Sequence, residues 1–214
     1  MDKNKQFVVT INRELGSGGR TVGELVAKRL GVPFYDKALI KTLEEKYGLT
    51  VEQIEQLKGR KHSWWSDFER VVALGECMSN MQYYEVPVGF ELPDVLTTDE
   101  LYKSETEILR GIAENGSCVI AGRTAFFVLK NQPNRLSVLI QAPMEQRIAR
   151  LMRKKGISHD AAGKIIEKVD KMRENYVKKY TGTSRYDTRN YDLVISMEGK
   201  TEEEAAKLIL DYIG

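Results

Sequence analysis

A β-branched apolar run followed at once by a glycine-rich turn is the feature that most restricts how this chain folds. Residues 7–11 read Phe-Val-Val-Thr-Ile, which is typical of a strand buried on both faces of a parallel sheet. Residues 16–19 read Gly-Ser-Gly-Gly, and apolar residues then recur at helical spacing from Val22 until Gly31. A strand, a glycine turn and a helix in this order predict a loop whose backbone N–H groups face an anion.

The alternation of strand and helix continues along the chain. After the first strand, we expect others at residues 32–35, 117–121, 136–141 and 191–196. Helices are expected between them, among them 99–114, 158–179 and 201–212, the last capped by Thr201 with Glu204 three residues on. This pattern predicts one three-layer α/β domain over residues 1–214, built around a parallel sheet. The block 37–114 interrupts the alternation and is interpreted as a helical insertion over one end of the sheet.

Composition excludes several classes of protein. The 214 residues are 42% hydrophobic and 30% charged, which is ordinary for a globular chain, and the net charge of +2 gives no argument for nucleic-acid binding. The two histidines are far apart in sequence, and the two cysteines form no CxxC pair. No apolar run approaches the roughly 20 residues of a membrane span. We therefore expect a cytoplasmic protein, monomeric or homodimeric, that binds neither membrane nor nucleic acid.

The glycine-rich loop departs from the usual phosphate-binding pattern GxxxxGK[ST]. Arg13 stands at the first glycine position and Gly19 at the lysine position. Thr21 follows where a hydroxyl can ligate Mg²⁺. Either Arg13 or Arg20 is expected to supply the missing positive charge, because guanidinium groups pair well with phosphate oxygens. The alternative is a glycine turn that binds nothing.

Four blocks of sequence resemble the cytidylate kinase-like family of P-loop nucleoside monophosphate kinases. They are similar to the phosphate loop at residues 11–21, the aspartate-containing segment at 34–40, the Gly-Arg strand end at 119–123, and the lid with its Asp-x-x-Arg at 142–150 and 170–173. In this family the Gly-Arg pair is normally followed by Asp, whereas Thr124 follows here. The resemblance implies a three-layer P-loop NTPase fold with a five-stranded parallel sheet, a helical substrate-binding insertion and a lid over residues 147–180.

The resemblance also implies roles for particular residues. Contact with ATP is expected from Arg13, Gly16, Ser17, Gly18, Gly19, Arg20 and Thr21, with Thr21 also holding Mg²⁺. Contact with the acceptor nucleotide is expected from Asp36, Arg123, Asp170 and Arg173. Catalytic charge stabilisation is expected from Arg20, Arg147 and Arg150.

Each of these residues also has an ordinary structural explanation. Residues 147–180 carry eleven bases against four acids, which is typical of a solvated helix face as well as of a phosphate clamp. Asp170 and Arg173 are one helical turn apart and could simply pair with each other. Asp36 could cap a helix. The loop over residues 180–190, with Arg185 and Arg189, is a further candidate for contact with the donor adenine.

The sequence therefore predicts a phosphotransferase that moves the γ-phosphoryl group of ATP to a nucleoside monophosphate, with CMP or dCMP first among the acceptors. Three alternatives remain. One is a kinase for another small acceptor, because Gly19 and Thr124 both depart from the family pattern. A second is a nucleotide-binding regulator that kept the fold and lost its chemistry with the lysine. A third is a structural or interaction protein that binds no nucleotide.

Overall fold

The computed structural model describes residues 1–36, 98–122 and 124–214. The chain divides into two compact units, Met1–Asp36 with Leu109–Gly214, and Lys37–Ile108. The sheet, and every contact described below, belongs to the first unit. Most of the predicted insertion, residues 37–97, lies outside the described residues, so its role stays a prediction.

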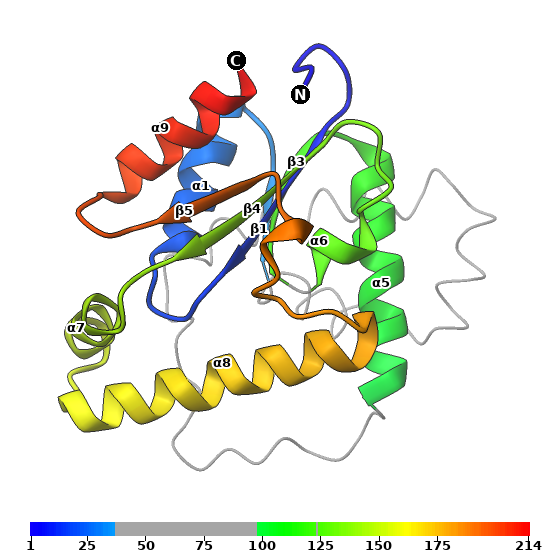
Figure 1. Ribbon diagram of the computed structural model, residues 1–214. Helices are drawn as coiled ribbons and strands as arrows, with labels where there is room; N and C mark the ends of the chain where they lie inside the picture. Colours follow the sequence, from blue (N-terminus) through cyan, green and yellow to red (C-terminus); the bar gives the residue numbers. More distant parts are fainter. Residues whose placement is uncertain (37–97, 123) are drawn as a thin grey trace. The chain divides into compact units, whose positions relative to one another are not determined.

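Five parallel strands form the sheet of the described residues (Figure 1). They are β1 (Val8–Arg13), β2 (Phe34–Tyr35), β3 (Cys118–Ala121), β4 (Arg135–Gln141) and β5 (Leu193–Ser196), in the spatial order β2-β3-β1-β4-β5. Val8 lies beside Cys118 of β3 on one side and Arg135 of β4 on the other, so β1 is the central strand. The predicted five-stranded parallel α/β fold is confirmed.

Helices follow most of the strands. They are α1 (Gly19–Leu30), α5 (Thr98–Asn115), α6 (Ala125–Val128), α7 (Met144–Lys155), α8 (His159–Thr181) and α9 (Glu202–Ile213), with a 3-10 turn, η1, at Thr188–Asn190. The predicted capping box at the start of α9 is present, because Thr201 accepts from the Glu204 amide and Glu204 accepts from Thr201. Gly31 ends α1 in a left-handed conformation, as expected.

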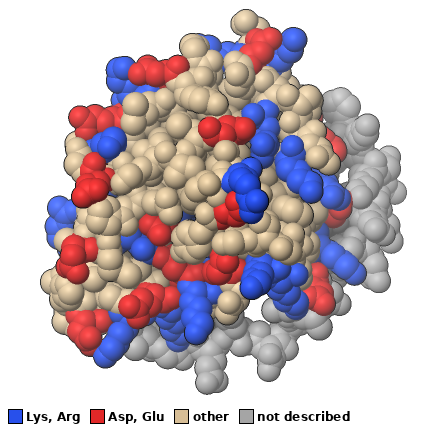
Figure 2. Space-filling model, in the orientation of Figure 1, with Lys and Arg blue, Asp and Glu red and all other residues tan. Residues whose placement is uncertain are grey.

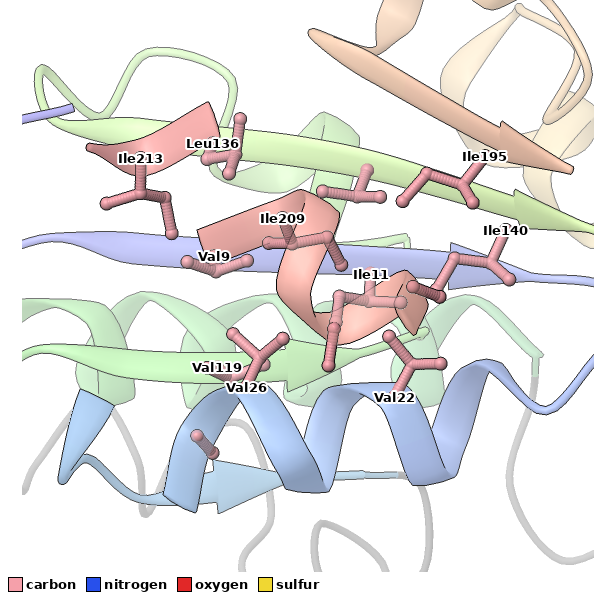
Figure 3. Packing of buried hydrophobic residues seen from close by; sticks show 14 of the residues in the cluster. Val9, Ile11, Val22, Val26, Val119, Leu136, Ile140, Ile195, Ile209 and Ile213 are labelled. Atoms are coloured by element: carbon pink, nitrogen blue, oxygen red, sulfur yellow. The ribbon is translucent and has the colours of Figure 1, made fainter. Parts of the chain in front are cut away.

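Two helices cover one face of the sheet. In Figure 3, Val22 and Val26 of α1 and Ile209 of α9 pack against side chains of β1, β3, β4 and β5, and all belong to one buried cluster. Burial of each such side chain contributes about 1.5–3 kcal/mol to folding. The opposite face of β4 packs against α6 and α8, through a second cluster that includes Phe126 and Val177. The sheet is thus covered on both faces, as a parallel sheet requires.

This packing brings the carboxyl ends of β1, β3 and β4 together, at the edge where parallel α/β sheets bind ligands. In Figure 1, the loop after β1 lies at this edge, close to α8, which runs below it. Positive and negative side chains are interspersed over the face seen in Figure 2, consistent with the balanced net charge. Over residues 1–36, 98–122 and 124–214, no helix is both long enough and apolar enough to span a bilayer.

Candidate active site

The glycine-rich loop connects β1 to α1 at the end of the central strand. Its backbone turns at Gly16 and Gly18, whose φ angles of +83° and +87° lie in the left-handed region that favours glycine. A Cβ atom at Gly16 would lie 2.9 Å from the Arg147 carbonyl oxygen, so the loop also packs tightly against α7. Gly18 is the N-cap of α1, so the N–H groups of the first helical turn lie at the loop. The loop can therefore receive an anion.

Ser17 stabilises this loop from within. Its hydroxyl donates to the Glu14 carbonyl oxygen at 3.0 Å and accepts from the Gly19 amide at 3.4 Å. The side chain is buried, so the structure gives this predicted ATP-binding residue a part in the turn itself. Thr21 is half-buried in the first turn of α1, at the position expected for a metal-ligating hydroxyl.

Arg13 and Gly19, the two departures from the usual loop pattern, lie against each other. A Cβ atom at residue 19 would be only 2.6 Å from the Arg13 Cβ, a distance that real Cβ atoms essentially never show. A side chain therefore fits at one of these positions but not at both without movement. The Arg13 guanidinium extends to Gly122, at the end of β3, where any Cβ would collide with it. The loop has thus exchanged the glycine and the cationic residue between two facing positions.

Arg20 and Asp36, both predicted as site residues, bind each other. The Arg20 Nε donates to the Asp36 Oδ2 at 2.6 Å, and the Arg20 Nη1 lies 2.8 Å from the Glu24 carboxylate. Asp36 is buried at the end of β2. The charge of Arg20 is therefore shared with two carboxylates, which weakens its candidacy as the replacement for the lysine.

Asp170 is the carboxylate to which the arginines of this site converge. It is 8% exposed, and its Oδ1 accepts a hydrogen bond from the Leu15 amide at 3.2 Å. Its Oδ2 accepts from Arg147, while the guanidinium groups of Arg173 and Arg185 lie 3.8 Å and 3.7 Å from Oδ1. The expected pairing of Asp170 with Arg173 is present, but as part of a larger network that also holds the loop.

Arg147 lies beneath the loop and is 5% exposed. Its Nε donates to the Leu15 carbonyl oxygen at 2.8 Å, and its Nη1 lies 3.6 Å from Glu14. Glu14 in turn accepts from the Ala142 amide at 3.0 Å. The third guanidinium nitrogen, Nη2, donates to Asp170, so all three face protein groups. This arrangement suits positioning of the loop better than the predicted approach to a transferring phosphoryl group.

Arg150, one turn further along α7, lies on another side of the loop. It forms an ion pair with Glu202 at the start of α9, and both side chains would contact a Cβ at Gly18, at 3.1 Å. Lys154 lies near this ion pair. Partial burial, and then the positive charges of Arg150 and Arg20, lower the pKa of Lys154 below its ordinary 10.5. A cationic group therefore borders the start of α1, and Lys154 is a member that sequence reasoning missed.

Arg13, Arg173 and Arg185 form a second cationic group at the end of β1. Partial burial lowers the pKa of Arg173, and the neighbouring positive charges of Arg13 and Arg185 add to the decrease, against the opposing effect of Asp170. Arg185 is 1% exposed and donates through Nη2 to the Arg13 carbonyl oxygen and the Asn12 side chain. Nothing in its sequence context marked it for burial, since it lies in a polar loop.

Arg123, the predicted phosphate ligand after β3, lies outside the described residues, so that expectation stays a prediction. Its neighbours are described. Gly122 has a φ of +87°, and Thr124 has a φ of +57°, which a β-branched residue rarely adopts. The end of β3 is thus held in a strained turn at the edge where ligands bind, as is common at functional sites.

The donor set suits a magnesium ion carried mainly by a nucleotide. The described residues include no group of three or more His, Cys, Asp or Glu side chains that could hold a metal. Mg²⁺ bound with nucleotides commonly takes most ligands from phosphates and water and only one or two from the protein. A single hydroxyl, that of Thr21, fits this requirement.

Comparisons with curated proteins give partial matches. Over 108 residues the chain is 27% identical to a cytidylate kinase from Methanopyrus kandleri, a match that covers 47% of this chain and 56% of that protein. Over 105 residues it is 30% identical to a uronate isomerase from Corynebacterium glutamicum, covering 49% of this chain and 20% of the other. The chain therefore spans about half or less of the length of these relatives.

Solved structures match over nearly the whole chain. An uncharacterized protein from Eubacterium ventriosum superposes with a TM-score of 0.64 at 22% identity, covering 97% of this chain and 98% of that one. Shikimate kinase from Acinetobacter baumannii in complex with shikimate gives 0.50 at 15% identity, covering 99% and 94%. These likenesses establish the fold, that of P-loop kinases. The model of the cytidylate kinase-like family matches residues 8–199, and the chain belongs to that family.

Proposed function

We propose that the protein transfers the γ-phosphoryl group of ATP to a nucleoside monophosphate, with CMP or dCMP as the first acceptors to test. Family membership and the kinase fold support a phosphotransferase. The observation that carries the proposal is the pinning of the glycine loop by Asp170 and Arg147. A turn that bound nothing would have little need for a buried carboxylate and a buried guanidinium holding its backbone at Leu15.

In the proposed reaction, an oxygen of the acceptor phosphate attacks the γ-phosphorus of ATP. The new P–O bond forms as the bond to the β,γ-bridging oxygen breaks, and the electron pair of that bond leaves with ADP. The protein supplies no nucleophile. Its contribution is position and positive charge, which account for most of the catalysis in phosphoryl transfer.

The two cationic groups divide this work. The backbone N–H groups of the loop and the start of α1 would hold the donor phosphates. Arg150 and Lys154 border the start of α1, while Arg13 and Arg173 lie at the end of β1. We assign Arg147 and Asp170 to positioning, because their polar atoms already hold the loop. Thr21 would hold Mg²⁺ through its hydroxyl, and the ion would supply neutralisation of phosphate charge there.

The test is ADP release from Mg-ATP, with CMP, dCMP, UMP, AMP and GMP added in turn. We expect stimulation by CMP or dCMP and a loss of about 10²–10³ in kcat for Arg173→Gln, the size reported for removal of one charge-stabilising donor. Lys171→Gln is the matched control, since Lys171 is an exposed cation on the same helix, two residues away. It is expected to retain full activity.

Other outcomes identify the alternatives. Stimulation by a small acceptor without a nucleobase, and by none of the monophosphates, would replace the acceptor class and keep the kinase. A melting temperature raised by ATP without stimulation by any acceptor would favour the nucleotide-binding regulator. Full activity with CMP in Arg173→Gln would contradict the assignment of Arg173 to the reacting phosphates.

A further inference from the structure

Arg185 is a fully buried cation with unused hydrogen-bonding capacity. One side of its guanidinium is engaged, because Nη2 donates to the carbonyl oxygen of Arg13 and, at 3.3 Å, to Asn12 Oδ1. Its Nε and Nη1 have no hydrogen-bond acceptor within the part of the chain that the structure describes. The Asp170 carboxylate lies 3.7 Å from Nη1, near enough for attraction but too far for a hydrogen bond. Buried donors without acceptors are costly, so this arrangement favours a missing partner.

The guanidinium groups around Arg185 share one carboxylate. The Asp170 carboxylate is shared by three guanidinium groups, those of Arg147, Arg173 and Arg185. Arg13 adds a fourth positive charge nearby, which contributes to the lowered pKa of Arg173. Of the other acids, Glu14 faces Arg147 at 3.6 Å, and Glu174 accepts from the backbone amide of Arg185. The single Asp170 carboxylate is therefore shared among more guanidinium groups than it can bind closely, an arrangement that favours a bound anion.

The cluster is open to solvent on one side. The Arg173 side chain is 36% exposed, whereas that of Arg185 is 1% exposed. The Arg185 guanidinium carbon lies over the Tyr186 ring, 5.2 Å from the centroid of that ring, and Tyr186 is only half-buried. A ligand that arrives beside Arg173 would reach the unused donors of Arg185 by displacing the Tyr186 ring.

We propose that Arg185 is a phosphate-binding residue that, with Arg13 and Arg173, forms an anion site beside the glycine loop. On the donor phosphates, this site would supply the positive charge that Gly19 does not. The inference rests on the proposed phosphotransfer for its purpose, but the site itself requires only an anion. Its ligand is a phosphoryl group, which belongs either to the donor nucleotide or to the acceptor.

The test measures binding of inorganic tripolyphosphate to the full chain by calorimetry. Arg185→Gln should weaken binding about 10- to 100-fold, since hydrogen bonds to charged groups are lost. Arg185→Lys should weaken it by about fivefold or more, because an ammonium cannot reproduce the planar set of donors. Arg189→Gln is the matched control. It removes an arginine of the same loop that is 88% exposed and paired with Asp187, and it should leave the affinity unchanged.

The variants separate binding from folding. If Arg185 is only structural, Arg185→Gln lowers the melting temperature without ligand but leaves the tripolyphosphate affinity of the folded protein unchanged, which would overturn the proposal. If Arg185→Gln does not fold, the charge-retaining Arg185→Lys decides, and a wild-type affinity in that variant would overturn it. Tripolyphosphate binding needs neither acceptor nor turnover. If the wild-type protein transfers no phosphoryl group but binds tripolyphosphate, and Arg185→Gln weakens that binding, the proposed function is contradicted and the anion site is supported.

Two nucleotides identify the source of the phosphoryl group. A larger loss of affinity for ADP than for CMP in Arg185→Gln places Arg185 on the donor phosphates. A larger loss for CMP places it on the acceptor phosphate. Either result supports the anion site, whereas unchanged affinity for both nucleotides and for tripolyphosphate contradicts it.

Discussion

The Asp170 carboxylate accepts a hydrogen bond from the backbone amide of Leu15 at 3.2 Å, although the two residues are 155 positions apart. The same carboxylate binds Arg147, which donates to the carbonyl oxygen of Leu15. The peptide groups of Leu15 are thus held on both sides by a buried ion pair. This relationship couples the conformation of the glycine loop to the packing of α7 against α8.

Replacement of Asp170 by Asn should therefore affect both stability and ligand binding. Loss of the carboxylate leaves three guanidinium groups without their shared anion, which should cost roughly 3 kcal/mol of folding free energy. For a chain of this size, we expect the melting temperature to fall by about 6–12 °C. Asp160→Asn is the control, because Asp160 is 77% exposed and paired only with Lys164 among the described residues, and its loss should cost less than about 1 kcal/mol. Equal melting temperatures for the two variants would contradict the role of Asp170.

The contact between Arg13 and Gly19 predicts that a side chain can be introduced at residue 19 without loss of stability only if the side chain of Arg13 is removed. Gly19→Lys alone should destabilise the protein by about 1–3 kcal/mol, because its Cβ meets that of Arg13. Arg13→Gly together with Gly19→Lys restores the first glycine and the lysine of the common loop pattern and removes the clash. Urea unfolding of the two single variants and the double variant should give a favourable coupling energy of about 1–3 kcal/mol. Simple additivity would show that the two side chains do not compete for space.

The ion pair between Arg150 and Glu202 predicts a pH-dependent contribution to stability. Burial acts to raise the pKa of Glu202, but the hydrogen bond and charge of Arg150 outweigh it and hold the pKa below its ordinary 4.5. The contribution is therefore present above pH 4.5 and is lost as the pH falls through the folded-state pKa. Glu202→Gln should be less stable than wild type by on the order of 1 kcal/mol at pH 7, and the difference should disappear as the pH falls below 4.5 and through the folded-state pKa. Glu203→Gln, at the exposed neighbouring position, should show no such convergence.

The buried hydroxyl of Tyr191 predicts a loss of folding stability at high pH, whereas the Glu202 ion pair predicts one at low pH. Burial raises its pKa to about 12, despite the opposing hydrogen bond from Asn12 and the charge of Arg185. The unfolded chain ionises near the ordinary value of 10, so this group lowers stability as the pH rises from 10 to 12. At pH 7, Tyr191→Phe should lose about 1 kcal/mol, because the hydroxyl donates to the Arg185 carbonyl oxygen at 2.7 Å.

Denaturant unfolding at pH 7, 10 and 11.5 tests this prediction for Tyr191. The difference between wild type and Tyr191→Phe should shrink above pH 10, because only the wild type carries the penalty. Tyr212→Phe is the control, since Tyr212 is 54% exposed, and the difference between it and wild type should stay constant. A constant difference for Tyr191→Phe would contradict the buried, un-ionised hydroxyl.

Much of the fold could be predicted because its elements carry strong local patterns. The five strands are short apolar runs, and the predicted capping box at Thr201 is a local hydrogen-bond motif. The predicted helix at 158–179 is observed as His159–Thr181. The helix expected between the strands at 117–121 and 136–141 is observed as the short α6, whereas η1 was not predicted, because three residues are too few to display a helical period.

The candidate site was harder to predict because its charges are placed by tertiary packing. The family resemblance implied a shared catalytic role for Arg147 and Arg150, whereas one lies under the loop and the other pairs with Glu202. Arg185 is an arginine in a polar loop, a setting that ordinarily predicts exposure. Its burial depends on Asn12 and Tyr191, which reach it from β1 and from the start of the β5 segment.

The strand order has a consequence for the newly made chain. β1 pairs with β3 and β4, more than a hundred residues further on, so at roughly 5–20 residues per second it waits on the order of ten seconds for a neighbour on the ribosome. The loop that follows it waits longer, because Asp170, Arg185 and Glu202 are synthesised later still. A nascent chain thus carries the glycine-rich sequence well before it has any affinity for phosphate. The proposed nucleotide binding therefore requires synthesis at least as far as Glu202, so nucleotides would not assist the earliest folding steps of β1.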